Sequence, residues 1–232
     1  YAGAPLVNNN GVNMLAPVLM AYGTPQQRAE HLPLIARSER MWAQGYSEVG
    51  AGSDLAALRM TARREGDEYV LNGHKTWTSN GMHADWIFVL ARTSTVSGKR
   101  QAGISFFLVD MASPGVSRRP IRSMTGYPTF AEEFFDDVRV PATNLVGAEG
   151  EGWQVAKALL DAERTNVVRA AQAQRFLDEL VEWCAAQGAA SPLRDPGKRA
   201  AVARLVEKVE VGRALSYRIA HLQEAKALTP GL

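Results

Sequence analysis

The stretch YSEVGAGSDLA, residues 46–56, decides between two fold classes for this chain. Its glycines fit the pattern G-x-G-x-x-x-A, which is close to the fingerprint of a dinucleotide-binding loop. Such a loop follows an apolar strand, opens a helix and precedes, about 20 residues on, an acidic residue that ends a second parallel strand. Here the preceding MWAQGYSEV is polar at every other position, and the following RREGDEYVLNGHKTW predicts turns at Gly66-Asp67 and Asn72-Gly73. We therefore exclude a dinucleotide loop and expect a β domain.

The residues from about 41 to 147 carry the pattern of short strands. Four runs are rich in Val, Ile, Phe, Trp and Thr and are separated by Asn-Gly, Ser-Gly and Ser-Pro-Gly. The runs are YVLNGHKTWTSN (69–80), ADWIFVLART (84–93), GISFFLVDM (103–111) and EEFFDDVRV (132–140). Their spacing predicts an antiparallel barrel or sandwich rather than alternating βαβ units.

Helical patterns flank this region on both sides. Before it, VNMLAPVLMAYG (12–23) is apolar, and Thr24 with Pro25 forms a good N-cap and first position for a second helix. After it, one long helix is expected from residue 151 to Gly188 and another over residues 197–227. Two such helices need partners to bury their apolar faces. We predict an α+β chain with a helical N-terminal remnant (1–40), a middle β-domain (41–147) and the first helices of an incomplete C-terminal bundle (148–232).

The composition of the chain excludes several kinds of partner and site. A net charge of +2 gives no reason to expect nucleic acid or an anionic membrane as partner. The single cysteine, Cys184, excludes an internal disulfide and is expected in the core, and the four histidines lack metal-ligand spacing. No apolar run approaches the ~20 residues of a membrane span, and no signal-peptide pattern is found. These features predict a cytoplasmic protein without a metal site. Separately, we expect the charged pair Glu132-Glu133 to be exposed to solvent.

Two short segments of the β-domain are candidates for a ligand site. Small residues in GAGS (50–53) let a flat or bulky ligand approach the backbone, and WTSNG (77–81) supplies an indole and two hydroxyls. Together they predict one wall of a planar cofactor site. The alternative is that Asn-Gly only marks a turn and that Trp77 is a core aromatic.

Three longer segments carry a resemblance to a known family. They are MWAQGYSEVGAGSDLAALRMTA (41–62), GHKTWTSNG (73–81) and FFDDVRVPATNLVGAEGEGW (134–153). In this order they resemble the acyl-CoA dehydrogenase family, of which the sequence is a partial chain. The resemblance implies FAD as cofactor and α,β-dehydrogenation of an acyl-CoA thioester to the trans-2-enoyl-CoA. It also implies that electrons pass to an electron-transfer flavoprotein, in lipid metabolism.

The resemblance also implies roles for individual residues. It puts Thr78 near the flavin N5, and a serine at position 53 next to the acyl-CoA. The residues implied in cofactor binding are Gln44, Tyr46, Ser47, Trp77, Thr78 and Ser79, and those implied in substrate binding are Ser53, Asp161 and Arg164.

Glu163 is the candidate general base. The spacing of the first long helix puts Ala156, Leu159 and Leu160 on an apolar stripe, with Glu163 in its middle. A carboxylate there is paired, or it faces a cavity where burial raises its pKa, which suits a base. The alternative is a side chain that reaches solvent at the edge of the stripe. In the resembled family the base lies either on this helix or in a later segment, beyond residue 232.

One loop departs from the resembled family. Between the two long helices most members have an Arg and a Phe-Gly pair that reach a neighbouring subunit, whereas this chain has AASPLRDPGKR (189–199). The altered loop resembles that of members that work as heteromeric pairs. Three hypotheses stay open: an active homotetrameric or homodimeric dehydrogenase, a non-catalytic or half-site subunit of a heteromer, and an acyl-CoA oxidase-like flavoprotein.

Overall fold

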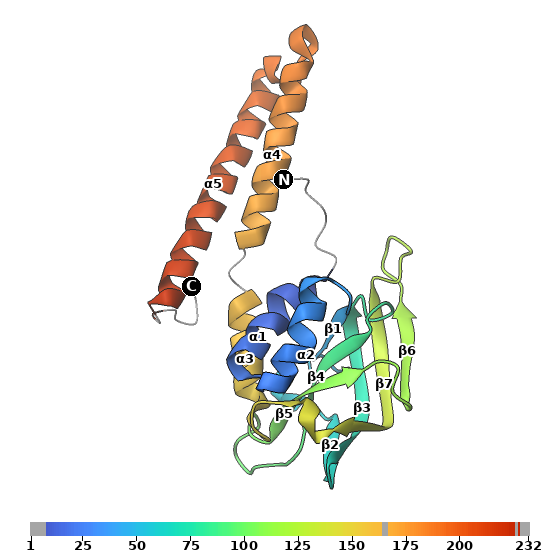
Figure 1. The fold of residues 1–232 in the computed structure, drawn as a ribbon. Coiled ribbons are helices and arrows are strands. Elements are labelled where there is room, and N and C mark those ends of the chain that lie inside the picture. The colour runs from blue at the N-terminus through green and yellow to red at the C-terminus, as the bar shows by residue number, and fades with distance from the viewer. Residues whose placement is uncertain (1–7, 164–166, 226, 228–232) are drawn as a thin grey trace. The chain divides into compact units, whose positions relative to one another are not determined.

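The computed structural model of the chain describes residues 8–163, 167–225 and 227. The chain divides into two compact units, Tyr1–Ala162 and Glu163–Leu232. The first unit combines a sheet with helices and the second is helical, which confirms the α+β class (Figure 1). The three-part division at residues 40 and 147 stays a prediction.

Eight strands form one sheet in the first unit. They are β1 (Trp42–Gly45), β2 (Thr61–Glu65), β3 (Glu68–Ser79), β4 (Trp86–Arg92), β5 (Ile104–Asp110), β6 (Val116–Ile121), β7 (Phe130–Pro141) and β8 (Leu145–Val146). The strand order is β6-β7-β3-β2-β4-β5-β8, and β1 pairs with β4. Most neighbours are antiparallel, as expected; β1 is parallel to β4, and β2 meets β4 through the single parallel pair Thr61 and Arg92.

The sheet separates two apolar cores. In β4, Phe88 and Leu90 face the core shared with the helices, whereas Ile87 and Val89 face a second core. This second core joins β4 and β5 to β2, β3 and β7, so the sheet bends over itself. Because both faces of β4 and β5 are buried, these strands read as continuous apolar runs rather than alternating ones.

Three α-helices cover the outer face of β4 and β5 (Figure 1). A π-helical segment (Asn10–Leu15) leads into α1 (Ala16–Tyr22), followed by α2 (Pro25–Ala36), and α3 (Gly152–Glu163) comes after the sheet. The predicted start of α2 is confirmed: Thr24 and Gln27 form a reciprocal capping box. The Gln27 amide also donates to Thr143 O and Leu145 O at 2.7 and 2.8 Å, which ties α2 to β8.

One predicted turn is wrong and the other is confirmed. Gly66 lies in the β2–β3 turn with φ +62°. Asn72 and Gly73 instead lie inside β3, where the pairing with β7 shifts register. Gly73 has φ +156°, and a Cβ there would lie 2.7 Å from Met60 Cβ, so glycine serves close packing rather than a turn.

The second unit contains a helical pair. Its helices are α4 (Val167–Ala186) and α5 (Pro196–Glu224), and Asp195 caps α5 through the Lys198 amide at 2.9 Å. The predicted single helix from 151 to 188 falls on α3 and α4, with residues 164–166 outside the described ones. Cys184 is buried, as expected. Short 3₁₀ turns complete the chain at Leu55–Ala57, Ala142–Asn144, Gly188–Ala190 and Pro192–Arg194.

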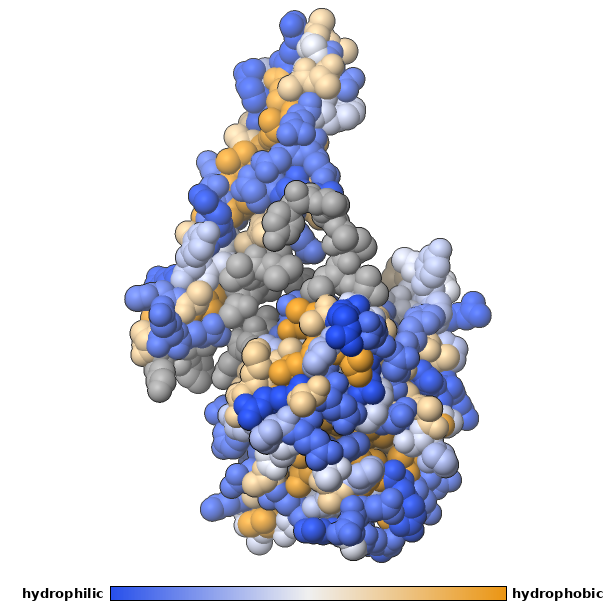
Figure 2. Space-filling view, viewed as in Figure 1, coloured by the Kyte–Doolittle hydropathy of each residue, from blue (hydrophilic) through white to orange (hydrophobic). Residues whose placement is uncertain are grey.

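Large apolar side chains of the helical pair stay exposed within this unit. Among them are Phe176 on α4 (67% exposed) and Tyr217 on α5 (67%). Figure 2 shows apolar atoms among hydrophilic ones along these helices. Within the described residues, no helix combines the length and the apolar character needed to cross a membrane.

Candidate flavin and acyl-CoA site

The stretch 46–56 forms a tight turn after β1. The Glu48 amide donates to Ala51 O at 2.9 Å, and the Ala51 amide donates to Glu48 O at 3.0 Å. Neither Gly50 nor Gly52 has a positive φ, and apart from the adjacent residues no atom of the described chain lies within 4 Å of the place where a Cβ would stand. The fold therefore does not require glycine at these positions. Open space along the backbone suits a ligand that lies against it.

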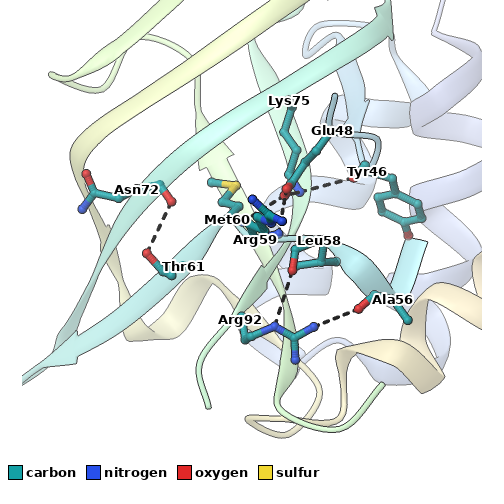
Figure 3. A network of polar contacts seen from close by, with 10 residues as sticks. All are labelled: Tyr46, Glu48, Ala56, Leu58, Arg59, Met60, Thr61, Asn72, Lys75 and Arg92. Carbon is teal, nitrogen blue, oxygen red and sulfur yellow. Dashed lines mark hydrogen bonds and ion pairs between the residues drawn. The ribbon is translucent and has the colours of Figure 1, made fainter. Parts of the chain in front are cut away.

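An ion pair between a buried lysine and a half-buried glutamate holds this turn against β3 (Figure 3). The fully buried Lys75 donates through Nζ to Glu48 Oε1 at 2.8 Å and to Tyr46 O at 3.3 Å. The same carboxylate accepts the amides of Arg59 at 2.6 Å and Met60 at 3.0 Å. One carboxylate thus joins the turn, the start of β2 and the middle of β3.

The electrostatics of the pair follow from burial and from these donors. Burial alone raises the pKa of Glu48, but the charge and hydrogen bond of Lys75 and the two backbone amides outweigh it, so the pKa is lowered. Burial lowers the pKa of Lys75, and Glu48 opposes that change. The carboxylate is therefore ionised at neutral pH and keeps its donors in place.

The residues that precede the two candidate ligand segments lie side by side. The Thr76 amide of β3 donates to Ser47 O at 2.9 Å. Beneath them, the buried Tyr46 ring makes edge contacts with Phe88 and Phe106, at ring distances of 5.9 and 6.4 Å. The sheet therefore brings the turn after β1 next to the end of β3, although about 30 residues separate them in the sequence.

Trp77 is not a core aromatic. The pairing of β3 with β7 shifts register between Lys75 and Thr78, so Trp77 lies in a bulge with φ +63°. Its side chain is 61% exposed, and within the described part of the chain its ring meets one other aromatic ring, the edge of Phe130, at a centroid distance of 6.0 Å. A left-handed conformation in a bulky residue costs about 1–3 kcal/mol and is characteristic of ligand sites.

Thr78 points to the opposite side of the strand. Its hydroxyl is buried and donates to Glu133 Oε2 at 2.5 Å. Glu133 Oε1 has no hydrogen-bond partner among the described residues, and a Cβ at Gly81 would collide with it. Burial raises the pKa of Glu133 to about 7, while Thr78 and the charge of Arg118 oppose the increase. The expectation of a solvated Glu133 is wrong.

The structure describes some predicted site residues and not others. Gln44 is half-buried at β1, and Ser47 is half-buried in the turn, whereas Ser53 and Ser79 are exposed. The side chains of Asp161 and Glu163 at the end of α3, and the whole of Arg164, lie outside the described residues. No group of three His, Cys, Asp or Glu side chains suited to a metal ion occurs in the described part of the chain.

A surface cleft of about 430 Å³ opens beside the turn. Its lining combines the turn, the approach to β2 and the bulged part of β3. The lining residues are Glu48, Val49, Gly50, Ala57, Arg59, Met60, Gly73 and His74. The turn is therefore accessible along Val49 and Gly50, which leaves its backbone available to a ligand.

Sequence reasoning missed three charged residues around the site. Lys75 and Glu48 were not singled out, and Glu133 was expected to be solvated, because charged residues are rarely buried. A signal was present for Glu133: Ala131, Glu133 and Phe135 alternate along β7, and all three are buried.

Comparison with known proteins identifies the family. The family model "Acyl-CoA dehydrogenase, middle domain" matches residues 43–138, and "Acyl-CoA dehydrogenase, C-terminal domain" matches residues 150–231. The chain belongs to the acyl-CoA dehydrogenase family, a family of flavoproteins.

Particular relatives agree with this assignment. Acyl-CoA dehydrogenase IpdE1 of Mycobacterium tuberculosis is 44% identical over 97% of this chain and 57% of its own length. The solved Tcur3481-Tcur3483 steroid ACAD (G363A variant) has a TM-score of 0.84 and 33% identity, over 96% of this chain and 57% of that one. The ChsE4-ChsE5 complex from M. tuberculosis has a TM-score of 0.81 and 37% identity, over 99% and 59%. The chain thus spans less than two thirds of these relatives.

Proposed function

We propose that the protein containing this chain catalyses flavin-dependent α,β-dehydrogenation of an acyl-CoA thioester to the trans-2-enoyl-CoA. The observation that supports it most strongly is that the chain just before the GAGS segment lies beside the Trp77 bulge, where the Thr76 amide donates to Ser47 O. An exposed indole beside an unobstructed backbone turn fits a planar ring system.

The residues present fit FAD on one face of the β-domain. We assign Gln44, Tyr46 and Ser47 to one side of the isoalloxazine. Trp77 and Ser79, whose side chains are exposed, take another side, and Thr78 supports them from beneath through Glu133. When bound, FAD supplies the acceptor for the hydride that leaves the β-carbon.

The chain's own residues handle the proton and the substrate. We assign removal of the α-proton to Glu163, and contacts with the acyl-CoA to Ser53, Asp161 and Arg164. A base and an acceptor held on opposite faces of the substrate convert a difficult step into a positioned one. Electrons then pass to an electron-transfer flavoprotein.

A Glu163→Gln variant of the full-length protein tests the assignment of the base. We expect kcat to fall by about 100- to 10,000-fold, while bound FAD is retained, because only the proton acceptor is lost. Anaerobic mixing with acyl-CoA measures the step through bleaching of the flavin absorbance. Glu179→Gln, at an exposed position paired with Arg175, is the matched control and keeps normal bleaching. Near-normal kcat in Glu163→Gln would move the base elsewhere.

A second candidate is a subunit of a heteromeric dehydrogenase. The names of two similar solved structures, Tcur3481-Tcur3483 and ChsE4-ChsE5, join two components, and one of them is called a steroid ACAD. The altered 189–199 loop and the exposed apolar residues of α4 and α5 also favour a partner chain. A protein that binds FAD and turns over steroid-type acyl-CoA only after a second subunit is added would establish this candidate. If the protein shows the same activity without a second subunit, a homotetramer or homodimer is favoured. Production of H₂O₂ with acyl-CoA would instead favour an oxidase.

A further inference from the structure

The segment 46–58, which contains the turn after β1, has two polar anchors, one at each end (Figure 3). At its far end, Arg92 donates to Ala56 O at 3.0 Å and to Leu58 O at 3.5 Å. At its near end, Lys75 is bound to the turn through Glu48 and the carbonyl of Tyr46. The backbone of this turn therefore depends on side chains from β3 and β4 for its position.

Lys75 also fixes the strand that carries the indole. It lies two residues before Trp77, at the point where the bulge in β3 begins. Thr78, on the other side of the bulge, is bound to Glu133. The strained residue is thus held between two buried polar side chains, as a strained conformation requires.

Stability alone does not explain a lysine at this position. A buried ion pair gains little over well-packed apolar residues of similar volume, because both charges lose their hydration. What the pair provides is geometry: Lys75 fixes Glu48, and that carboxylate accepts two amides at the start of β2. A methionine would fill the space of the lysine but would not fix the carboxylate.

We propose that Lys75 is a positioning residue, which acts through Glu48 to set the Tyr46–Ala51 turn against the Trp77 bulge and thereby shapes the flavin-binding face. The inference rests on the proposed function. Because its side chain is fully buried, Lys75 is not in a position to contact flavin or substrate; it sets the distance between the two segments proposed to contact them.

The test compares Lys75→Met with the double variant Lys75→Met/Glu48→Gln in the full-length protein. Lys75→Met leaves the half-buried Glu48 carboxylate without its cation and lowers the melting temperature, whereas the double variant removes both charges and recovers most of the loss. The proposal expects the double variant still to bind FAD more weakly, to show an altered visible flavin spectrum, and to lose about 100-fold in kcat/KM. Arg139→Met, which removes an exposed pair with Glu65 and Glu68 on the same sheet, is the control.

The outcomes separate this inference from the proposed function. A double variant with the melting temperature, FAD affinity and spectrum of the wild type would overturn the positioning role, while the proposed function stands. Failure of the double variant to fold would also overturn it, because the pair would then serve the fold itself. A wild-type protein that binds no FAD would overturn the proposed function and the inference together.

Discussion

Glu133→Gln removes a buried carboxylate whose ionisation opposes folding at neutral pH. The side chain is fully buried, and burial raises its pKa from the ordinary 4.5 to about 7. Because one pKa unit corresponds to 1.36 kcal/mol, the ionised carboxylate costs the folded protein about 3 kcal/mol. Glutamine keeps an oxygen for the Thr78 hydroxyl and carries no charge at any pH.

The direction in which the unfolding free energy changes with pH depends on whether Glu133 loses its proton at a lower pH in the unfolded or in the folded state. The unfolded chain deprotonates near pH 4.5, and the folded protein near pH 7, so stability is lost as the pH rises between these values. We expect the unfolding free energy of Glu133→Gln, relative to wild type, to increase by about 2.5 kcal/mol between pH 5 and pH 8. Urea denaturation of both proteins at four pH values measures this difference.

Glu65→Gln is the control with the opposite sign. Hydrogen bonds from Arg63 and Arg139 lower the pKa of Glu65, so the stability that it contributes is lost as the pH falls. Since this pair is exposed, its effect is small. A difference between Glu133→Gln and wild type that stays constant from pH 5 to pH 8 would refute the argument that burial controls Glu133.

Two further substitutions test the glycines of the β-domain. Gly73→Ala is expected to destabilise the protein by about 2–4 kcal/mol, because its Cβ would press on Met60 and its φ is unfavourable; denaturant midpoints measure the loss. Gly50→Ala is expected to change stability by less than about 0.5 kcal/mol, because open space surrounds it. The same variant is expected to weaken binding of FAD or acyl-CoA in a titration, and unchanged binding of both would argue against a ligand on this turn.

Much of the fold could be predicted from the sequence because the local conformational preferences of the residues agree with their tertiary surroundings. The runs that became β4 and β5 are buried on both faces, so their apolar sequence carries the strand signal without alternation. The start of α2 was readable because Thr24 and Pro25 satisfy the first helical turn by themselves.

Asn72-Gly73 shows where local chemistry fails. Asn-Gly is a strong hairpin signal, but β3 continues through it because β2 pairs on one side and β7 on the other. The Asn72 side chain binds the amide of Asp137 at 3.0 Å and its carboxylate at 2.9 Å, across the bulge. Tertiary pairing thus uses the same two residues to bend a strand rather than to reverse it.

The sequence predicted where the candidate site lies, but not which of its side chains are exposed and which are buried. The small and aromatic residues near 46–56 and 77–81 pointed to a ligand surface, and the sheet brings both segments together. Whether Trp77 is exposed and Thr78 buried depends on a one-residue register shift against β7. A shift of one residue exchanges the faces of a strand, and no local pattern in β3 records it.

Glu48 and Glu133 show why the protonation states of the carboxylates could not be predicted from the sequence either. Lys75 lies directly opposite Glu133 in the register of β3 and β7, which by pattern alone suggests an ion pair. The lysine instead binds Glu48, and Arg118, whose charge lowers the pKa of Glu133, donates its hydrogen bonds to the carbonyls of Gly81 and Ala84. Glu48 therefore has a cation and two amides and a lowered pKa, whereas Glu133 has one hydroxyl and a raised one. Because Lys75 binds Glu48 rather than Glu133, Glu48 is the carboxylate that stays ionised. The same ion pair holds the Tyr46–Ala51 turn in place.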